Sequence, residues 1–267
     1  MKKVLLFLLV LAATSCSKPS GQDNSMYLDD GRFAGGHEYV DLGLSVRWAT
    51  CNIGATAYSE VGDYYAWGEL SPKKKYVWTN YKYLLSEPYS EYYDINNYNR
   101  YKKYDWELGV TISGNKLDVL ELCDDVARQE WGIRWRMPTY EEVKELMTDP
   151  RLSRTIVEDY PFRGINGVLI ESNIKGYEGN TLFFPLTEFY YGDSKIPEIY
   201  PKRTYFIARE PLCWTSSLSF PDLAEFFSAS EMSRFMGQKI DPGMELNIAP
   251  RFVGLPIRPV SPNPRNQ

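Results

Sequence analysis

The chain has 267 residues, of which 43% are hydrophobic and 24% are charged, and its net charge is −5. This composition is that of a globular protein and excludes a disordered one. A nucleic-acid partner is disfavoured, because phosphate binding needs clustered Lys and Arg, and the longest basic run covers only residues 73–75. The aromatic fraction of 15% favours a β-rich chain with long loops.

The N-terminus has the layout of a bacterial lipoprotein signal peptide. Lys2 and Lys3 precede an apolar run at residues 4–13, which is too short to span a bilayer. The run ends in the tetrapeptide ATSC, which resembles a lipobox whose Cys16 becomes the acylated first residue. We expect residues 1–15 to be removed and Cys16 to hold the protein on the membrane through several acyl chains. A plain secretory signal is the alternative.

The mature chain divides into a tether, one domain and a short tail. Residues 16–36 are rich in Ser, Gly, Asp and Asn and predict a flexible tether. The folded domain is expected at residues 37–261, followed by a tail at residues 262–267. Two short strands are predicted on either side of a Gly43-Leu44-Ser45 turn, and residues 61–69 predict a further aromatic strand.

A tyrosine-rich segment follows at residues 76–104, without a stable period. Its pattern predicts a long surface insertion that serves as the main recognition surface, because a Tyr ring offers both a stacking face and a hydroxyl. The alternative is that these rings cover an edge of the scaffold. The nine tyrosines are Tyr76, Tyr81, Tyr83, Tyr89, Tyr92, Tyr93, Tyr98, Tyr101 and Tyr104. The predicted ligand-binding residues are Tyr89, Tyr92, Tyr93, Tyr98 and Trp106.

Two helices are predicted next. Residues 117–130 carry an apolar stripe at helical spacing and predict the first helix. The sequence WGIRWRMPTYEEVKEL at residues 131–146 places two indoles, Trp131 and Trp135, in the core. Thr139 and Glu142 then form a capping box that starts a second helix near residue 140.

Alternating strand and turn patterns occupy the rest of the chain. The pair Asn166-Gly167 predicts a tight hairpin turn, and Pro185 is expected to end a strand at residues 181–184. Closing strands are predicted at residues 212–217, 226–230 and 253–260.

Five motifs in this order resemble the FISUMP domain, a family found in lipoproteins of Gram-negative anaerobes. They are VDLGLSVRWATCNIGA at 40–55, YYAWGE at 64–69, DDVARQEWGIRWRMPTYEEVKEL at 124–146, CWTSS at 213–217 and GLPIRPV at 254–260. The resemblance covers nearly the whole mature chain. It implies an α+β, C-type-lectin-like single domain with short antiparallel strands, two short helices and long loops, related in fold to formylglycine-generating enzymes. It also implies an outer-membrane lipoprotein.

The residues do not supply a familiar catalytic constellation. The single histidine, His37, excludes a Ser-His-Asp triad, a Cys-His pair and multi-His zinc sites, and we interpret it as a solvated residue at a strand entrance. Once Cys16 is acylated, Cys51, Cys123 and Cys213 remain, and we interpret them as buried unreactive thiols, with a single disulfide between two of them as the alternative. The paired Cys of formylglycine-generating enzymes is missing, since Cys213 stands alone.

The remaining polar candidates have structural interpretations. Asp124 and Asp125 are predicted to cap the first helix, with a calcium site as the alternative, although no metal or cofactor is expected. Glu141 and Glu142 match a helix N-terminus. The strand residues Trp214, Ser216 and Ser217 and the group Arg258 are predicted to be structural.

These observations predict a non-catalytic binding or adhesion module that recognises a glycan or a protein. Two alternatives stay open: a carboxylate-based glycan-active enzyme, and a structural accessory or tip subunit of a surface assembly. A cleft with two facing carboxylates would favour the enzyme, whereas an aromatic loop surface would favour binding.

Overall fold

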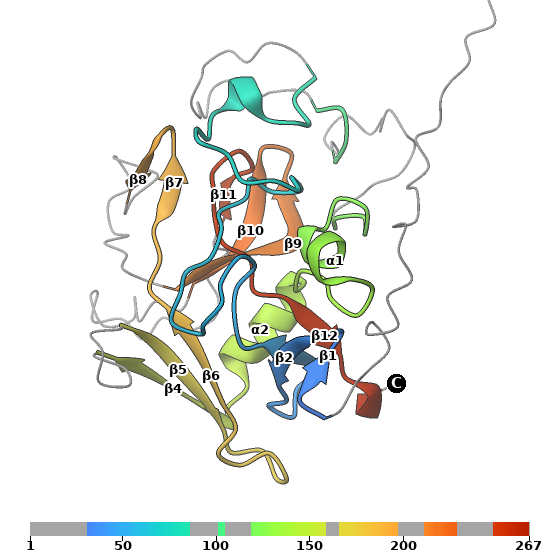
Figure 1. Ribbon diagram of the computed structural model, residues 1–267, viewed down its shortest axis with the longest axis vertical. Coiled ribbons are helices and arrows are strands. Elements are labelled where there is room, and N and C mark those ends of the chain that lie inside the picture. Colours follow the sequence, from blue (N-terminus) through green and yellow to red (C-terminus); the bar gives the residue numbers. More distant parts are fainter. Residues whose placement is uncertain are drawn as a thin grey trace, which may run out of the picture.

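In the computed structural model, the described residues are 31–85, 101–104, 119–158, 166–196, 211–228 and 248–266. These residues form antiparallel sheets with two short helices, an arrangement consistent with an α+β class (Figure 1). The helices are α1 (Val126–Trp131) and α2 (Tyr140–Thr148), and short 3₁₀ turns lie at Trp78–Asn80 and Pro264–Asn266. Four sheets are seen in the described part of the chain.

The strands of each sheet come from distant parts of the sequence. The first sheet has the order β1 (Phe33–Ala34), β2 (His37–Val40), β3 (Val46–Ala49) and β12 (Val260–Pro262). The second has the order β11 (Ile248–Pro250), β10 (Leu223–Ser228) and β9 (Leu212–Phe220). The third has the order β4 (Leu152–Val157), β5 (Gly167–Ser172) and β6 (Thr181–Pro185). A two-stranded ribbon joins β7 (Phe189–Tyr191) to β8 (Ser194–Ile196).

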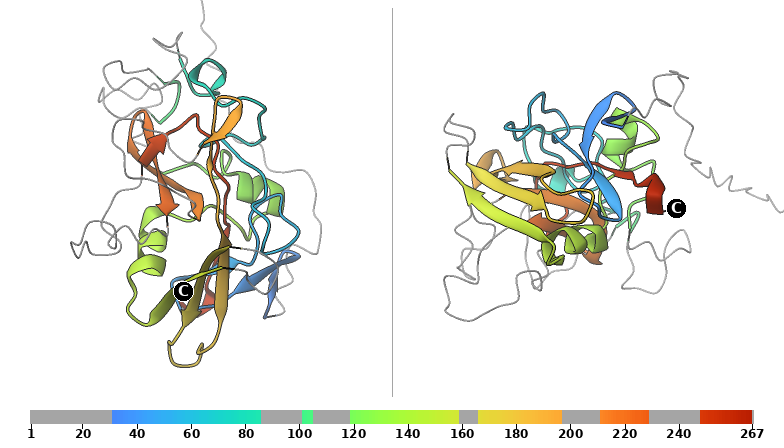
Figure 2. Two further views of the ribbon diagram at one scale, coloured as in Figure 1. Left: turned by 90° about the vertical axis from the view of Figure 1, so that its left-hand side faces the viewer. Right: turned by 90° about the horizontal axis from the view of Figure 1, so that it is seen from below.

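The two ends of the domain meet in the first sheet (Figure 2). Strand β2 pairs with β3, as the prediction of two strands around Gly43 requires, and β1 and β12 pair with the outer edges of β2 and β3. The fold extends beyond the predicted boundaries of residues 37–261 at both ends. Ala34 is buried, and the buried amide of Asn263 donates to the Leu44 carbonyl at 3.2 Å. Residues 33–34 and 263 therefore belong to the packed domain rather than to a tether or a tail.

Helix α2 begins as predicted, because its capping box forms within four consecutive residues. The Thr139 hydroxyl accepts from Glu142 N at 3.3 Å, and the Glu142 carboxylate accepts from Thr139 N at 2.8 Å. Arg136 adds an ion pair to Glu142. The apolar face of α2, with Val143 and Leu146, is buried in a core cluster that also contains residues of the first, second and third sheets.

The first helix is shorter than predicted, since it covers Val126–Trp131 and not residues 117–130. Asp125 explains the late start. Its carboxylate accepts from Arg128 N at 3.2 Å, as an N-cap, and from Met137 N at 2.7 Å. The predicted capping role is confirmed for Asp125. Burial of Trp135 is also confirmed, whereas Trp131 is only half-buried.

The predicted Asn166-Gly167 turn is wrong. Strand β4 pairs with β5 in a register that places Val157 opposite Gly167, so the connection spans residues 158–166 and Gly167 is already a strand residue. A Cβ on Gly167 would lie 2.2 Å from the Phe184 carbonyl and 2.4 Å from the Phe183 ring. Glycine is therefore needed for close approach of β6, not for a turn. The end of β6 at Pro185 agrees with the prediction.

Two predicted strands are instead irregular segments that cross the core. Residues 61–69 and 253–260 meet in an isolated bridge between Tyr65 and Leu255. The chain turns away directly afterwards at Gly68, whose φ is +75°. The closing strand at residues 212–217 is confirmed as part of β9, and residues 226–228 of the other closing strand are confirmed as part of β10, whereas residues 229–230 lie outside the described residues.

Five of the nine tyrosines in the insertion lie in the core, so for them the predicted surface role is wrong. They are Tyr76, Tyr81, Tyr83, Tyr101 and Tyr104. Their hydroxyls are hydrogen-bonded inside the protein; Tyr81, for example, donates to the Trp67 carbonyl at 2.8 Å. Burial raises the pKa of Tyr76 to about 12. These rings pack the scaffold and leave no face for a ligand.

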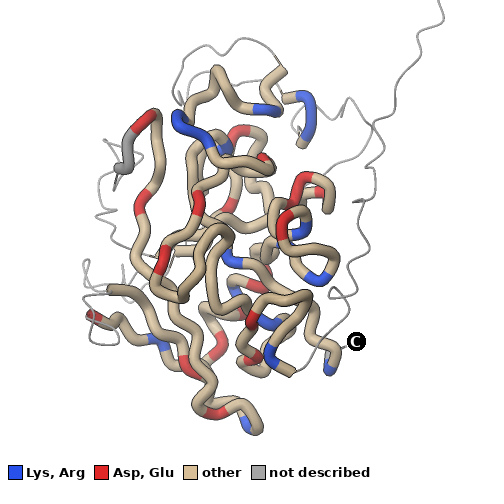
Figure 3. Tube along the Cα trace, in the orientation of Figure 1, with Lys and Arg blue, Asp and Glu red and all other residues tan. Residues whose placement is uncertain are grey.

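Charged side chains of both signs alternate along the described trace (Figure 3). Some ion pairs join near neighbours in the sequence, such as Arg151 with Asp149 at 2.6 Å, and others join distant residues, such as Lys82 with Asp124 at 3.2 Å. Within the described residues, the helices are too short and too polar for any of them to cross a membrane.

Candidate functional site

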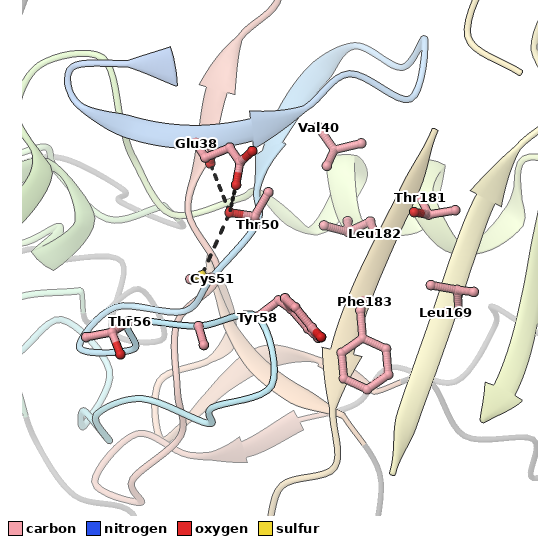
Figure 4. Close-up of a pocket in the computed structure, with 11 residues that line it drawn as sticks. Glu38, Val40, Thr50, Cys51, Thr56, Tyr58, Leu169, Thr181, Leu182 and Phe183 are labelled. Atoms are coloured by element: carbon pink, nitrogen blue, oxygen red, sulfur yellow. Dashed lines mark hydrogen bonds between the residues drawn. The ribbon is translucent and has the colours of Figure 1, made fainter. Parts of the chain in front are cut away.

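A cleft of about 360 Å³ opens between the first sheet and the β5–β6 hairpin (Figure 4). Its volume falls in the range of roughly 300–1,000 Å³ that is typical of small-ligand sites. Three segments contribute: strand β2, the chain that follows β3, and the facing strands β5 and β6. The lining residues are Glu38, Val40, Thr50, Cys51, Thr56, Ala57, Tyr58, Leu169, Thr181, Leu182 and Phe183.

One side of the cleft, here called the apolar wall, is formed by Leu169, Leu182 and Phe183. Leu169 on β5 lies directly opposite Phe183 on β6 in the antiparallel register, so their side chains project from the same face of the sheet. The alternate residues Val168 and Phe184 point to the core. Because the core side of β6 is fixed by this packing, the apolar wall has a rigid support.

The opposite side, here called the polar wall, contains Glu38, Thr50 and Cys51. Glu38 is exposed on β2 next to the buried Tyr39, as strand alternation requires. The Thr50 hydroxyl lies 3.4 Å from the Glu38 carboxylate and 3.8 Å from the Cys51 sulfur. These long contacts leave the hydroxyl and the carboxylate free to exchange partners with a ligand.

Tyr58 closes one end of the cleft. It is 37% exposed, and its ring packs edge-on against Phe183 with centroids 6.0 Å apart. Figure 4 shows Tyr58 projecting from its loop toward β6. The aromatic pair thus joins the polar and apolar walls.

Arg258 supports the polar wall from behind. It is fully buried, and its guanidinium donates to the carbonyls of Ala49 at 3.0 Å and Thr50 at 2.9 Å. A third bond, of 2.7 Å, goes to the Asn52 side-chain oxygen. Burial lowers the pKa of Arg258 to about 10. The prediction that Arg258 is a structural hydrogen-bonding group is confirmed, because its guanidinium joins the backbone at Ala49 and Thr50 to the Asn52 side chain.

Other sequence candidates also have structural positions. The indole of the buried Trp214 donates to the Tyr65 carbonyl at 2.8 Å. Ser216 donates to the Pro138 carbonyl at 3.1 Å, and Ser217 accepts from Tyr140 N at 3.0 Å. Ser216 and Ser217 thus hold β9 against the start of α2, and Trp214 ties β9 to Tyr65, so all three have the structural role that was predicted.

His37 is not the solvated residue that the sequence predicted. Its ring stacks on Trp131 with centroids 3.8 Å apart and planes inclined by 6°. It also meets Trp135 edge-on. This half-buried position lowers the pKa of His37 through desolvation.

The free thiols differ in accessibility. Cys213 is buried, and burial raises its pKa to about 12, in agreement with the predicted inert thiol. Cys51 is also a free cysteine but is only half-buried, in the polar wall of the cleft.

A group of metal-type ligands lies at Glu121, Cys123 and Asp124. The prediction of a buried free thiol is wrong for Cys123, because this residue is half-buried and disulfide-bonded, so its sulfur is not a free thiolate for a metal. Its carboxylates are already neutralised, because Lys103 forms ion pairs with both Glu121 and Asp124. Lys82 adds a second ion pair to Asp124 at 3.2 Å. Asp124 thus serves a local charge network and Asp125 caps α1, an arrangement that provides no separate support for the calcium alternative.

The binding residues predicted from the sequence are not among those that the structure describes. Cys16, Tyr89, Tyr92, Tyr93, Tyr98 and Trp106 lie outside the described residues. The cleft residues that sequence reasoning missed come from three separate segments. The one available signal was the loop at residues 53–63, where a tyrosine stands between Gly54 and Gly62.

Protein-family models, curated proteins and solved structures give no match to this chain.

Proposed function

We propose that this chain is a lipid-anchored binding module of the bacterial cell envelope, and that the cleft beside Tyr58 recognises a glycan. The main support for this proposal is one open cleft that has the apolar wall on one side and the polar wall on the other. The finer assignment of the fold as C-type-lectin-like, and of the protein as an outer-membrane FISUMP lipoprotein, belongs to the same proposal. It rests on the five sequence motifs.

The two walls match the chemistry of a sugar ring. A pyranose has an apolar face of C–H groups and a rim of hydroxyls, so one face can pack on Leu169 and Phe183 while the rim bonds to Glu38 and Thr50. A carboxylate accepts two or more hydroxyl donors, and a threonine hydroxyl both donates and accepts. An extended apolar peptide would leave the polar wall without partners, which is costly once water is excluded.

The same lining favours binding over hydrolysis. Glycoside hydrolysis by the usual mechanism uses two carboxylates, which flank the bond roughly 5–10 Å apart. Among the described lining residues, Glu38 is the one carboxylate. The cleft therefore supports recognition of a sugar, and the carboxylate-based enzyme receives no support from it.

Replacing Cys16 by Ala is expected to release the protein from membranes. The acyl chains implied by the lipobox supply the anchoring energy, at about 0.8 kcal/mol for each buried CH₂ group. Membrane fractionation and mass spectrometry of the mature N-terminus measure the effect. Retention of the Cys16→Ala protein with membranes, or an unmodified Cys16 in the wild type, would show that the lipid assignment is wrong.

Replacing Tyr58 by Ala is expected to weaken glycan binding by about tenfold or more, because an aromatic residue that contacts the ligand commonly contributes about 2 kcal/mol or more. Titration calorimetry with chitotetraose, cellotetraose and tetragalacturonate measures this on the full chain. Phe220→Ala is the matched control, since Phe220 is an aromatic of 45% exposure that does not line the cleft. It should bind as the wild type does.

The tyrosine-rich segment is the alternative location for the ligand-binding site. The triple substitution of Tyr89, Tyr92 and Tyr93 by Ala tests the surface predicted from the sequence, where stacking contributes roughly 1 kcal/mol per ring. Loss of binding in the triple variant with full binding by Tyr58→Ala would move the site to that segment. Binding of an envelope protein but none of the oligosaccharides would replace the glycan by a protein partner.

A further inference from the structure

The loop that carries Tyr58 is a closed unit. The chain enters at Ile53 and leaves at Asp63, where Asp63 N donates to the Ile53 carbonyl at 2.9 Å. Gly54 and Gly62 flank this neck, both with φ of +78°. A Cβ on Gly62 would lie 2.2 Å from the Ile53 carbonyl oxygen, and one on Gly54 would lie 2.4 Å from the Asp63 carboxylate. The two ends of the loop are therefore joined as tightly as backbone packing allows.

Inside the loop, one carboxylate holds the backbone. A single oxygen of Glu60 accepts from Thr56 N at 2.7 Å, from the Thr56 hydroxyl at 3.0 Å and from Ala57 N at 3.3 Å. These backbone N–H bonds, led by that of Thr56, lower the pKa of Glu60. The residue next to Ala57 is Tyr58, so the three bonds fix the direction in which Tyr58 leaves the loop.

Glu60 does not line the cleft, whereas Thr56, Ala57 and Tyr58 do. The base of the loop is also tied to the core, because the Asn52 side chain donates to the Val61 carbonyl at 2.7 Å and accepts from Arg258. The neck is thus anchored at one end. At the tip, the Glu60 carboxylate holds Thr56 and Ala57 on one side of Tyr58, and a backbone bond from Glu60 N to the Ala57 carbonyl at 3.0 Å closes the turn around Tyr58.

We propose that Glu60 is the positioning residue of the cleft: it touches no ligand, but its carboxylate holds Tyr58 against Phe183 and so sets the shape of the site before the ligand arrives. This inference rests on the proposed glycan-binding function. Pre-ordering of a loop raises affinity because the ligand no longer has to immobilise it. Immobilising one side chain on binding costs about 0.5–1.5 kcal/mol, which corresponds to about two- to tenfold in affinity.

A double-mutant cycle on the full chain tests the inference. Glu60→Ala should weaken binding of chitotetraose or cellotetraose by about two- to tenfold. In a Tyr58→Ala background the same change should have no effect, because the residue that Glu60 positions is gone. Glu60→Gln keeps an acceptor oxygen and should restore most of the affinity. Equal losses from Glu60→Ala in both backgrounds would overturn the proposal.

A ligand-free measurement separates this inference from the proposed function. Amide hydrogen exchange at Thr56 and Ala57 should quicken in Glu60→Ala while the melting temperature changes little. Glu178→Ala is the matched control, since Glu178 is an exposed carboxylate that accepts from Gly176 N at 2.6 Å in another loop. It should leave these two amides unchanged. Failure of both oligosaccharides to bind the wild type would refute the glycan function. Unchanged exchange in Glu60→Ala would refute the positioning role.

Discussion

Replacement of Trp135 by Ala is expected to lower the free energy of unfolding by about 3–5 kcal/mol. Trp135 is fully buried with Ala34, Tyr39 and Ala49, and its indole donates to the Ala34 carbonyl at 2.7 Å. The substitution creates a cavity and also removes the indole donor from that carbonyl. Urea denaturation followed by circular dichroism measures the change.

Trp131 provides the comparison for this result. It is the neighbouring indole, 5.3 Å from Trp135 between ring centroids, but it is only half-buried. Trp131→Ala should therefore destabilise the protein clearly less than Trp135→Ala. If the two variants lost equal stability, the difference in burial between the indoles would be contradicted.

The second large effect is expected at Arg251, whose replacement by Met should cost about 3–5 kcal/mol of folding stability. Arg251 is fully buried, and its guanidinium donates to the carbonyls of Tyr104 and Pro221, each at 2.9 Å, and to the Tyr81 hydroxyl at 3.0 Å. It also lies over the Tyr101 ring at 4.0 Å. Methionine has a similar length but leaves these acceptors without donors.

Two further variants test whether the loss of stability depends on the buried guanidinium of Arg251. Arg251→Lys retains the charge but not the planar fork, and its stability should fall between those of the wild type and Arg251→Met. Arg265→Met changes an exposed arginine and should have little effect. Thermal unfolding of the three proteins is the measurement. A stability of Arg251→Met close to that of Arg265→Met would show that the buried network does not hold the tyrosine-rich insertion.

The elements that the sequence predicted well are those determined by neighbouring residues. The capping box of α2 lies within four residues, and the β2 and β3 strands surround a turn at Gly43, whose φ is +81°. Asp125 likewise caps the next residues of its own chain. Local hydrogen bonds and backbone preferences suffice for these features.

The features that were missed depend on residues far apart in the chain. Gly167 resembles a turn residue, and only the position of Phe183 and Phe184 shows that it is needed for close packing. The tyrosines of the insertion resemble surface residues because nothing near them reveals Arg251, which lies 147 residues after Tyr104. Pattern alone cannot separate a buried ring that has a distant partner from an exposed one.

The cleft could not be predicted for the same reason. Glu38, Tyr58 and Phe183 belong to three segments, and each looks ordinary in its own surroundings. Their assembly follows from the pairing of β2 with β3 and of β5 with β6, and from the contact of Tyr58 with Phe183. A site of this kind is a property of the tertiary fold.

Methyl NMR of the full chain during a titration with chitotetraose or cellotetraose tests the glycan site most directly. The proposal predicts that the methyl resonances of Val40, Leu169 and Leu182, which line the cleft, shift with one common dissociation constant. The methyls of Leu122 and Ile156, which are exposed but do not line the cleft, should stay in place. Saturable binding that leaves the three cleft residues unshifted and moves other resonances would contradict the proposed site.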